Sequence, residues 1–125
     1  MTTAAYQGEP GSNSATAARA LYPEGDELPC TSFEQALDAV TLGAADVAVI
    51  PVDNSAAGRV ADVHHLLPES GLFIVAEYFL AIRFALMGVP GATLEQVECV
   101  RSHVRALGQC RKALREGGWG PVASD

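Results

Sequence analysis

A continuous apolar run, Val47-Ala48-Val49-Ile50, is the feature that most limits what this chain can fold into. Three of its four residues are β-branched, and no polar residue alternates with them. Such a run suits a strand that is buried on both faces, as in a parallel sheet. The sequence therefore predicts a strand over residues 46–52 and an α/β fold class, in which helices pack against a parallel sheet.

The residues before this run supply strands and helices in alternation. Ser12 can cap one helix, and Ser32 followed by Gln35 forms a capping-box pattern at the start of another. Gly43 closes the second helix. The predicted elements are a strand over 3–7, a helix over 13–21, a strand over 27–30 and a helix over 33–42 with an apolar stripe at Phe33, Ala36, Leu37 and Val40.

The second half of the chain is predicted to cross into another lobe. A helix over 60–67 should stop at Pro68, and the apolar stretch 72–86 should form one long strand or two strands with a kink. We expect residues 1–77 to form a first α/β lobe and residues 78–125 the start of a second, incomplete lobe. The further elements are a turn at Pro90-Gly91, one helical turn over 93–97, a strand over 99–101 and a helix over 102–115 ended by Gly117-Gly118. Residues 119–125 are expected to add no further strand or helix.

Composition excludes several classes of function. The net charge of −7 argues against nucleic-acid binding, because phosphate backbones need clustered Lys and Arg. The three cysteines have no Cys-x-x-Cys spacing, which favours reduced thiols in a cytoplasmic protein. Three histidines without clustered acids predict no metal site, and no apolar stretch reaches the roughly 20 residues of a membrane helix.

Three segments carry polar groups where a ligand could bind. The Gly-rich loop 8–14 could present backbone amides to an anion, or could be an ordinary strand–helix turn. Asp53, Asn54 and Ser55 follow the buried strand and could bind a carboxylate, or could only cap the next helix. Ser102 and His103 stand at a predicted helix start, where the histidine is either structural or functional. No nucleophile elbow, P-loop or dinucleotide fingerprint is present.

Taken together, these segments resemble the prephenate dehydratase family. Residues 6–11 resemble the family's opening segment, and residues 50–58 are similar to its Pro-x-Glu-Asn-Ser-x-x-Gly motif. Residues 102–110 are similar to its Ser-His-x-x-Ala-Leu-x-Gln-Cys helix, and residues 58–68 also resemble bacterial members. The resemblance covers essentially the whole chain in the right order.

The resemblance implies a two-lobed fold like a type-II periplasmic binding protein, with the active site in the cleft between the lobes. It implies conversion of prephenate to phenylpyruvate, carbon dioxide and water in phenylalanine biosynthesis, with no cofactor. Aromatisation supplies the driving force, so the protein must hold two carboxylates and protonate the leaving hydroxyl. The implied partner is small-molecule prephenate, with no nucleic acid and no membrane, and we expect a homo-oligomer.

Carried over by position, the resemblance implies that Asn54, Ser55, Gly58, Ser102, His103 and Gln109 bind substrate. Ser102 and the amides beside it are assigned to carboxylate binding, and bracing of the site is the alternative role for Gln109. Position 53 is Asp where the family usually has Glu. The family's Thr-Arg-Phe motif, which bears the hydroxyl regarded as catalytic, has no match, so no catalytic residue is assigned and its place is expected beyond Asp125. The usual regulatory ACT domain has no match either.

Four interpretations stay open at this stage. The first is a portion of a prephenate dehydratase that is inactive alone. The second is an arogenate dehydratase, whose substrate carries an ammonium group where prephenate carries a keto group. The third is a module that binds a small carboxylate without chemistry. The fourth is a structural remnant whose exposed apolar seam drives self-association.

Overall fold

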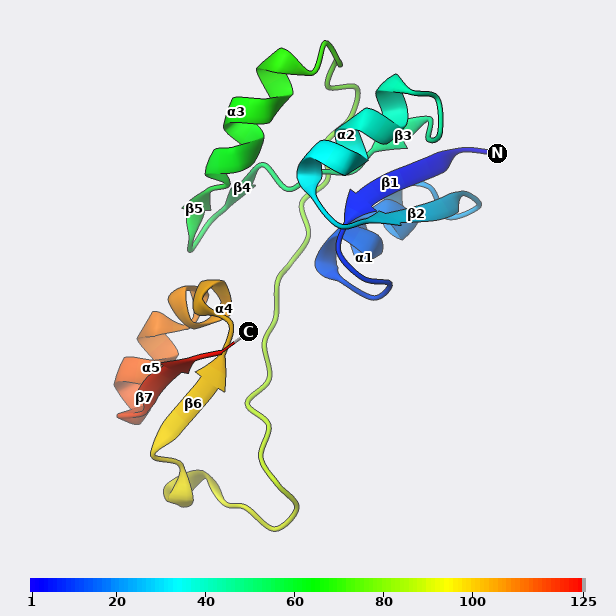
Figure 1. Cartoon of the computed structure of the whole chain (residues 1–125). Helices are drawn as coiled ribbons and strands as arrows, with labels where there is room; N and C mark the ends of the chain where they lie inside the picture. Colours follow the sequence, from blue (N-terminus) through cyan, green and yellow to red (C-terminus); the bar gives the residue numbers. More distant parts are fainter. Residues whose placement is uncertain (125) are drawn as a thin grey trace. The chain divides into compact units, whose positions relative to one another are not determined.

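The computed structural model describes residues 1–124 and has the expected mixed α/β character. The described chain forms two compact units, one of residues 1–54 and 59–82, the other of residues 55–58 and those from 83 onward. The elements (Figure 1) are β1 (Thr3–Gln7), α1 (Asn13–Leu21), β2 (Asp26–Cys30), α2 (Phe33–Thr41), β3 (Val47–Ala48), β4 (Asp53–Asn54), β5 (Gly58–Arg59), α3 (Ala61–Glu69), the 3-10 helix η1 (Leu94–Gln96), β6 (Cys99–Ser102), α4 (Val104–Gln109), α5 (Arg111–Gly117) and β7 (Gly120–Ala123).

The first unit is built on a parallel sheet in the order β2-β1-β3. Successive residues of a strand point to opposite faces, and β1 uses both faces for packing. Ala4 and Tyr6 join a buried cluster with Ala15 and Ala18 of α1. On the other face, Ala5 belongs to a cluster with the alanines of α2. Helices therefore cover both sides of β1, as Figure 1 shows, and the predicted alternation of strands and helices is confirmed.

The strand that is buried on both faces is β1 rather than the run 46–52. Only Val47–Ala48 forms a strand, and residues 47–50 are half-buried. β3 lies at the sheet edge and pairs with β1 alone among the described residues. The Val49 amide donates to the Ala5 carbonyl at 2.8 Å, so the contact continues briefly past the strand. The prediction of a doubly buried strand at 46–52 is wrong because edge position, not composition, sets burial.

Local caps begin α1 and α2 as predicted. The Ser12 hydroxyl accepts from the Ala15 amide at 3.3 Å, and the Ser32 hydroxyl accepts from the Gln35 amide at 3.1 Å. The Gln35 side chain, however, accepts from the Thr31 amide at 2.7 Å, so the reciprocal bond of a capping box goes one residue further back. Gly43, with a φ of +79°, follows α2 where only glycine adopts this conformation without strain.

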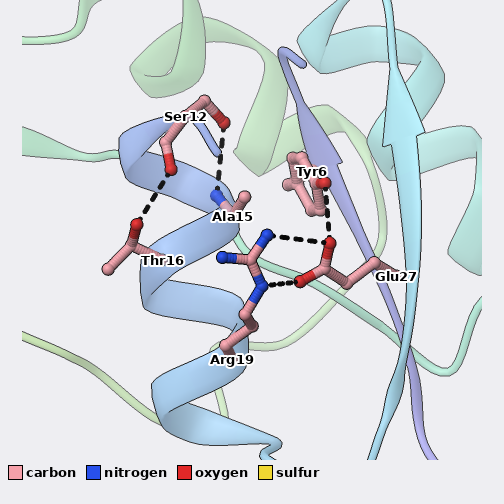
Figure 2. A network of polar contacts seen from close by, with 6 residues as sticks. All are labelled: Tyr6, Ser12, Ala15, Thr16, Arg19 and Glu27. Carbon is pink, nitrogen blue, oxygen red and sulfur yellow. Dashed lines mark hydrogen bonds and ion pairs between the residues drawn. The ribbon is translucent and has the colours of Figure 1, made fainter. Parts of the chain in front are cut away.

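A polar network ties α1 to the sheet (Figure 2). The hydroxyl of the fully buried Tyr6 donates to the Glu27 carboxylate at 3.1 Å. The same carboxylate of β2 accepts from the Arg19 guanidinium of α1. Arg19 holds the pKa of Glu27 below its usual value, against burial and with help from Tyr6, and burial together with the Glu27 bond raises the pKa of Tyr6.

These two pKa shifts predict loss of stability at both ends of the pH scale. A lowered carboxyl pKa stabilises the fold above the ordinary value of 4.5, and this contribution disappears as the pH falls through the lower folded pKa. A raised tyrosine pKa costs stability as the pH rises above 10.0. Thermal unfolding of Glu27→Gln should therefore show a smaller drop in Tm between about pH 6 and about pH 3 than the unaltered chain. Equal drops would contradict the role given to Glu27.

Two predictions for the middle of the chain are wrong. Pro68 does not stop α3 but lies inside its last turn. Residues 72–86, expected to form one long strand or two strands with a kink, form no strand in the part of the chain that is described. The cause is the lack of a neighbour: apolar, β-branched composition favours a strand, but a strand exists only where another lies beside it. The predicted turn at Pro90-Gly91 and the helical turn at η1 are confirmed.

The second unit is a β-α-α-β unit. β6 extends to Ser102, one residue further than predicted, and the single helix expected over 102–115 is two helices that meet at Cys110, where φ −104° and ψ 13° leave the helical range. β7 pairs with β6 in parallel, so the expectation that residues 119–125 add no further strand or helix is wrong for the described part. Leu107 of α4 and Leu114 of α5 are buried in this unit, and Gly118 in the left-handed region ends α5.

Candidate functional site

A short hairpin carries three of the predicted substrate-binding residues. Asn54 ends β4, Ser55 opens the turn and Gly58 begins β5 with a φ of +82°. The turn needs this conformation after three loop residues, which explains a glycine at this position. The Asp53 carboxylate accepts from the Asn54 amide at 3.0 Å and so contacts its own backbone. The hairpin therefore brings Asn54, Ser55 and Gly58 together on one element.

Helix capping does not explain the polar residues of this hairpin. α3 begins after Val60, whose side chain makes no capping hydrogen bond. Asp53, Asn54 and Ser55 lie before β5, which separates them from the helix. The interpretation that these side chains only cap the next helix is wrong, and the substrate-binding prediction for Asn54 and Ser55 stays open.

Ser102 and His103 lie at the carboxyl ends of two parallel strands. Ser102 is the last residue of β6, and its carbonyl accepts from the Ser124 amide at 2.9 Å, just past β7. A surface hollow at this edge is lined by His103, Val104, Ala123 and Ser124. In α/β sheets, ligands bind outside the carboxyl ends of strands, so Ser102 and His103 lie where ligands of such sheets commonly bind.

The ring of His103 has one nitrogen already in use. His103 is the N-cap of α4, and its Nδ1 accepts from the Arg105 amide at 3.2 Å. A backbone N–H only donates, so Nδ1 is the unprotonated nitrogen of the neutral ring and Nε2 carries the hydrogen. The exposed side chain can therefore offer an N–H donor to a ligand, and it cannot use Nδ1 as a base without giving up the cap.

Gln109 stands apart from Ser102 and His103 within the same unit. It is the last residue of α4, and His103 precedes the first. Six residues of helix rise about 9 Å, so the two side chains lie at opposite ends of the helix. This separation fits the alternative role of Gln109, in which it braces the site and does not contact the substrate.

The Gly-rich loop after β1 behaves as an ordinary turn. The Gly8 amide donates to the Cys30 carbonyl at 2.9 Å, and the Ser12 amide donates to the Glu9 carbonyl at 3.0 Å. The Ser12 hydroxyl is occupied by the cap of α1. Because these groups are already bonded within the chain, the turn interpretation is favoured over anion binding at this loop.

Charge is divided unevenly along the chain. Six of the eight Lys and Arg residues follow residue 82, against four of the fifteen acids. The part that contains the Ser102 segment is therefore cationic inside an acidic protein, and Arg101 and Arg105 flank the segment with exposed side chains. A local positive potential of this kind favours an anionic ligand in spite of the net charge of −7.

Residues 1–124 contain neither a cluster of metal ligands nor a helix that could span a membrane. No group of three His, Cys, Asp or Glu side chains within residues 1–124 could hold a metal ion. None of the helices described is long and apolar enough to cross a bilayer.

Two residues of the hollow, Ala123 and Ser124, were missed from the sequence. The short strand that brings them beside Ser102 pairs with a segment about 20 residues earlier, and such pairing leaves little local signal. The only local indication of a strand after the helix was Gly117-Gly118, which ends the helix, followed by the β-branched Val122.

Comparison with known proteins identifies relatives for nearly the whole chain. The prephenate dehydratase family model matches residues 4–124. A "Bifunctional N-acyl-homoserine lactone acylase/prephenate dehydratase" of Komagataeibacter europaeus is 44% identical over 118 residues, which are 94% of this chain and 42% of the relative. An "Arogenate dehydratase/prephenate dehydratase 1, chloroplastic" of Arabidopsis thaliana is 42% identical over 113 residues, 90% of this chain and 29% of that protein.

Solved structures agree on the fold. The structure titled "GqqA- a novel type of quorum quenching acylases" aligns with a TM-score of 0.72 and 43% identity, over 98% of this chain and 45% of its own. The prephenate dehydratase of Staphylococcus aureus aligns with a TM-score of 0.75 at 24% identity, over 98% of this chain and 47% of its own. The chain spans less than half the length of these relatives. It belongs to the prephenate dehydratase family.

Proposed function

We propose that this chain supplies part of the substrate-binding surface of a prephenate dehydratase and does not turn over substrate alone. Prephenate loses its ring carboxylate as carbon dioxide and its ring hydroxyl as water, and the leaving hydroxyl takes up one proton. The observation that carries the proposal is the place of the family's Ser-His motif at the carboxyl ends of β6 and β7, beside a hollow. The chain contains no match to the family motif that bears the catalytic hydroxyl, so the proton donor is not assigned to any residue here.

The residues proposed to bind substrate offer hydrogen-bond donors suited to carboxylates. Ser102 has a hydroxyl, His103 an Nε2–H, and Asn54 and Gln109 have amide N–H groups. Donors that are held by the backbone around them lose little freedom on binding, and His103 is held by its cap. Ser55 and Gly58 complete the proposed set from the hairpin.

A pair of substitutions separates the two roles of His103. In His103→Asn, the side-chain oxygen takes the place of Nδ1 and keeps the cap, but nothing replaces Nε2. In His103→Gln, the amide nitrogen reaches the place of Nε2, but the cap is lost at a cost of about 1 kcal/mol. We expect His103→Asn to lower kcat/KM about tenfold or more with an unchanged Tm.

His103→Gln should show the reverse pattern, with a lower Tm and a smaller loss of kcat/KM. The measurement uses a grafted enzyme, in which this chain replaces the matching 118 residues of the Komagataeibacter europaeus relative. Equal losses of rate in both variants, or a normal rate in His103→Asn, would remove Nε2 from substrate binding.

Arogenate dehydration is the neighbouring alternative. A relative named "Arogenate dehydratase 1" from Petunia hybrida is 41% identical over 91% of this chain. The two substrates differ at the side-chain keto or ammonium group, while the proposed carboxylate donors would serve both. Rates of the grafted enzyme on the two compounds decide between them, and we expect prephenate to be turned over faster.

Acyl-homoserine lactone hydrolysis is a second candidate, because one relative and one similar solved structure are named as acylases. Amide hydrolysis with Ser102 as the nucleophile would need a base beside its hydroxyl. The Nδ1 atom of His103 is bonded to the Arg105 amide, and no hydrogen bond joins the Ser102 hydroxyl to this ring within residues 1–124. The dehydratase proposal is therefore preferred.

The direct test uses the chain as it stands. Calorimetry with prephenate should detect binding to the 125-residue chain, while an assay for phenylpyruvate should detect no turnover. Turnover by this chain alone would contradict the proposed division of the active site. Absence of binding, with the chain shown to be folded by circular dichroism, would contradict its role in binding substrate.

A further inference from the structure

The backbone carbonyl of Val52, the residue before β4, accepts two hydrogen bonds. The Val60 amide, just after β5, donates to it at 3.1 Å. The Nε2 atom of His64, in α3, lies 3.1 Å from the same oxygen. A carbonyl oxygen has two lone pairs, so these two bonds fill its capacity. Three segments of the chain therefore meet at one oxygen atom.

The direction of the His64 bond follows from its partner. A carbonyl oxygen only accepts, so Nε2 carries a hydrogen and donates it. This donor is present both in the charged ring and in the neutral ring that has its hydrogen on Nε2. The half-buried side chain of His64 is therefore tied to a defined backbone atom. The neighbouring His65 is exposed and, one residue further along the helix, points in another direction.

A third hydrogen bond closes this arrangement into a ring. The His64 amide donates to the Val60 carbonyl at 3.3 Å, in the first turn of α3. The three bonds that join Val52, Val60 and His64 in pairs form a hairpin clamp. Val52 precedes β4 and Val60 follows β5, so the clamp fixes both ends of the segment between them. Val63, which is 1% exposed, holds α3 itself in place by packing.

The hairpin between these two ends is short. β4 and β5 have two residues each and form a two-stranded sheet. A two-stranded hairpin alone is at best marginally stable in water. Its side chains therefore keep a fixed place only if its base is tied to a packed element. Figure 1 shows that α3 follows the hairpin directly, and the His64 side chain supplies this tie from the helix.

We propose that His64 is a positioning residue for substrate binding, which acts by holding the base of the hairpin that carries Asn54 and Ser55. The inference rests on the proposed function, in which these two residues bind substrate. Asn54 is two residues from Val52, so a shift of the Val52 carbonyl moves it directly. Donors held in place before binding lose little freedom when substrate binds, and a misplacement of about 1 Å can cost about 10²-fold in rate. His64 itself has no contact with the substrate in this proposal.

Three substitutions in the 125-residue chain isolate the Nε2 donor. His64→Asn places its amide near the position of Nδ1, too short to reach the Val52 carbonyl. His64→Gln places an amide nitrogen near the position of Nε2 and keeps the donor. His65→Asn makes the same change at the exposed neighbour and serves as the matched control. Two measurements apply to each variant: hydrogen exchange of the Val60 amide by NMR, and calorimetry with prephenate.

His64→Asn should speed exchange of the Val60 amide about tenfold, while the amides of β1 keep their protection, because only the clamp opens. The same variant should bind prephenate about tenfold more weakly. His64→Gln and His65→Asn should both resemble the unaltered chain. In the double variant N54A/H64N, the loss of affinity should be smaller than the product of the two single losses, because His64 acts through the hairpin that carries Asn54.

Several results would overturn this role of His64. A normal Val60 exchange rate in His64→Asn would show that the clamp does not hold the hairpin, and faster exchange in β1 as well would make His64 a support of the whole unit. If the unaltered chain binds prephenate and His64→Asn binds it equally well, or His64→Gln binds it as weakly as His64→Asn, the positioning role is wrong and the proposed function stands. If the unaltered chain is folded and does not bind prephenate, the proposed function fails, and the role of His64 in it fails too.

Discussion

In the grafted enzyme, Asn54→Ala and Ser102→Ala are each expected to lower kcat/KM for prephenate by about 10²-fold or more. Removing one donor that faces charge in the transition state has an effect of this order. Ser102 ends β6 beside the hollow, and Asn54 lies on the β4–β5 hairpin, where capping of α3 does not explain it. The rate of phenylpyruvate formation measures both effects.

Controls distinguish loss of binding from loss of folding. Asn54→Asp keeps the shape of the side chain but replaces its N–H donors with a negative charge, so we expect a loss at least as large as for Asn54→Ala. Thr16→Ala removes an exposed hydroxyl that donates to the carbonyl of Ser12, the N-cap of α1, and its rate should be normal. Unchanged rates in both Asn54→Ala and Ser102→Ala, with normal Tm values, would remove these residues from the site.

Tyr6→Ala should destabilise the first unit by about 3–5 kcal/mol, the usual cost of deleting a buried aromatic ring. Tyr6 is fully buried in β1 and packs with Ala15 and Ala18 of α1. Urea unfolding of the 125-residue chain, followed by circular dichroism, measures the free energy.

Tyr6→Phe is the matched control for this prediction. It keeps the ring and removes only the hydroxyl that donates to Glu27, so the loss should be about 1 kcal/mol. If Tyr6→Ala and Tyr6→Phe had the same small effect, the ring would not be a main support of the core. If Tyr6→Phe were as harmful as Tyr6→Ala, the polar network rather than packing would dominate.

Features set by neighbouring residues were predictable from the sequence. The caps at Ser12 and Ser32, the ends at Gly43 and Gly118, and the helical turn at Thr93 depend on bonds across three or four residues, and the structure contains all of them. The core stripe of α2 follows in part, since Ala36 and Leu37 are buried while Phe33 is only half-buried.

Features set by distant partners were not predictable in the same way. The apolar run at Val47 becomes a sheet edge because β1, not β3, lies in the middle. The stretch after Leu72 has strand composition but no strand beside it, whereas Val122 sits in a strand because β6 lies next to it. Pairing over long sequence distances decides these cases, and composition alone does not record it.

The candidate site shows the same division. Motif resemblance selected Ser102 and His103, and the structure adds that Ser102 belongs to a strand end and that His103 uses Nδ1 as a cap. The hydrogen-bond direction that leaves Nε2–H available was not readable from the sequence. The excess of Lys and Arg over acidic residues after residue 82 can be counted in the sequence. The net charge of −7 for the whole chain does not show this local excess.

The most direct test of the dehydratase function is the rate at which the grafted enzyme converts prephenate to phenylpyruvate. If this chain carries the family's substrate-binding residues, the rate should be within about tenfold of the unaltered relative. A grafted enzyme that is folded, still hydrolyses acyl-homoserine lactone, and forms no phenylpyruvate would contradict that function.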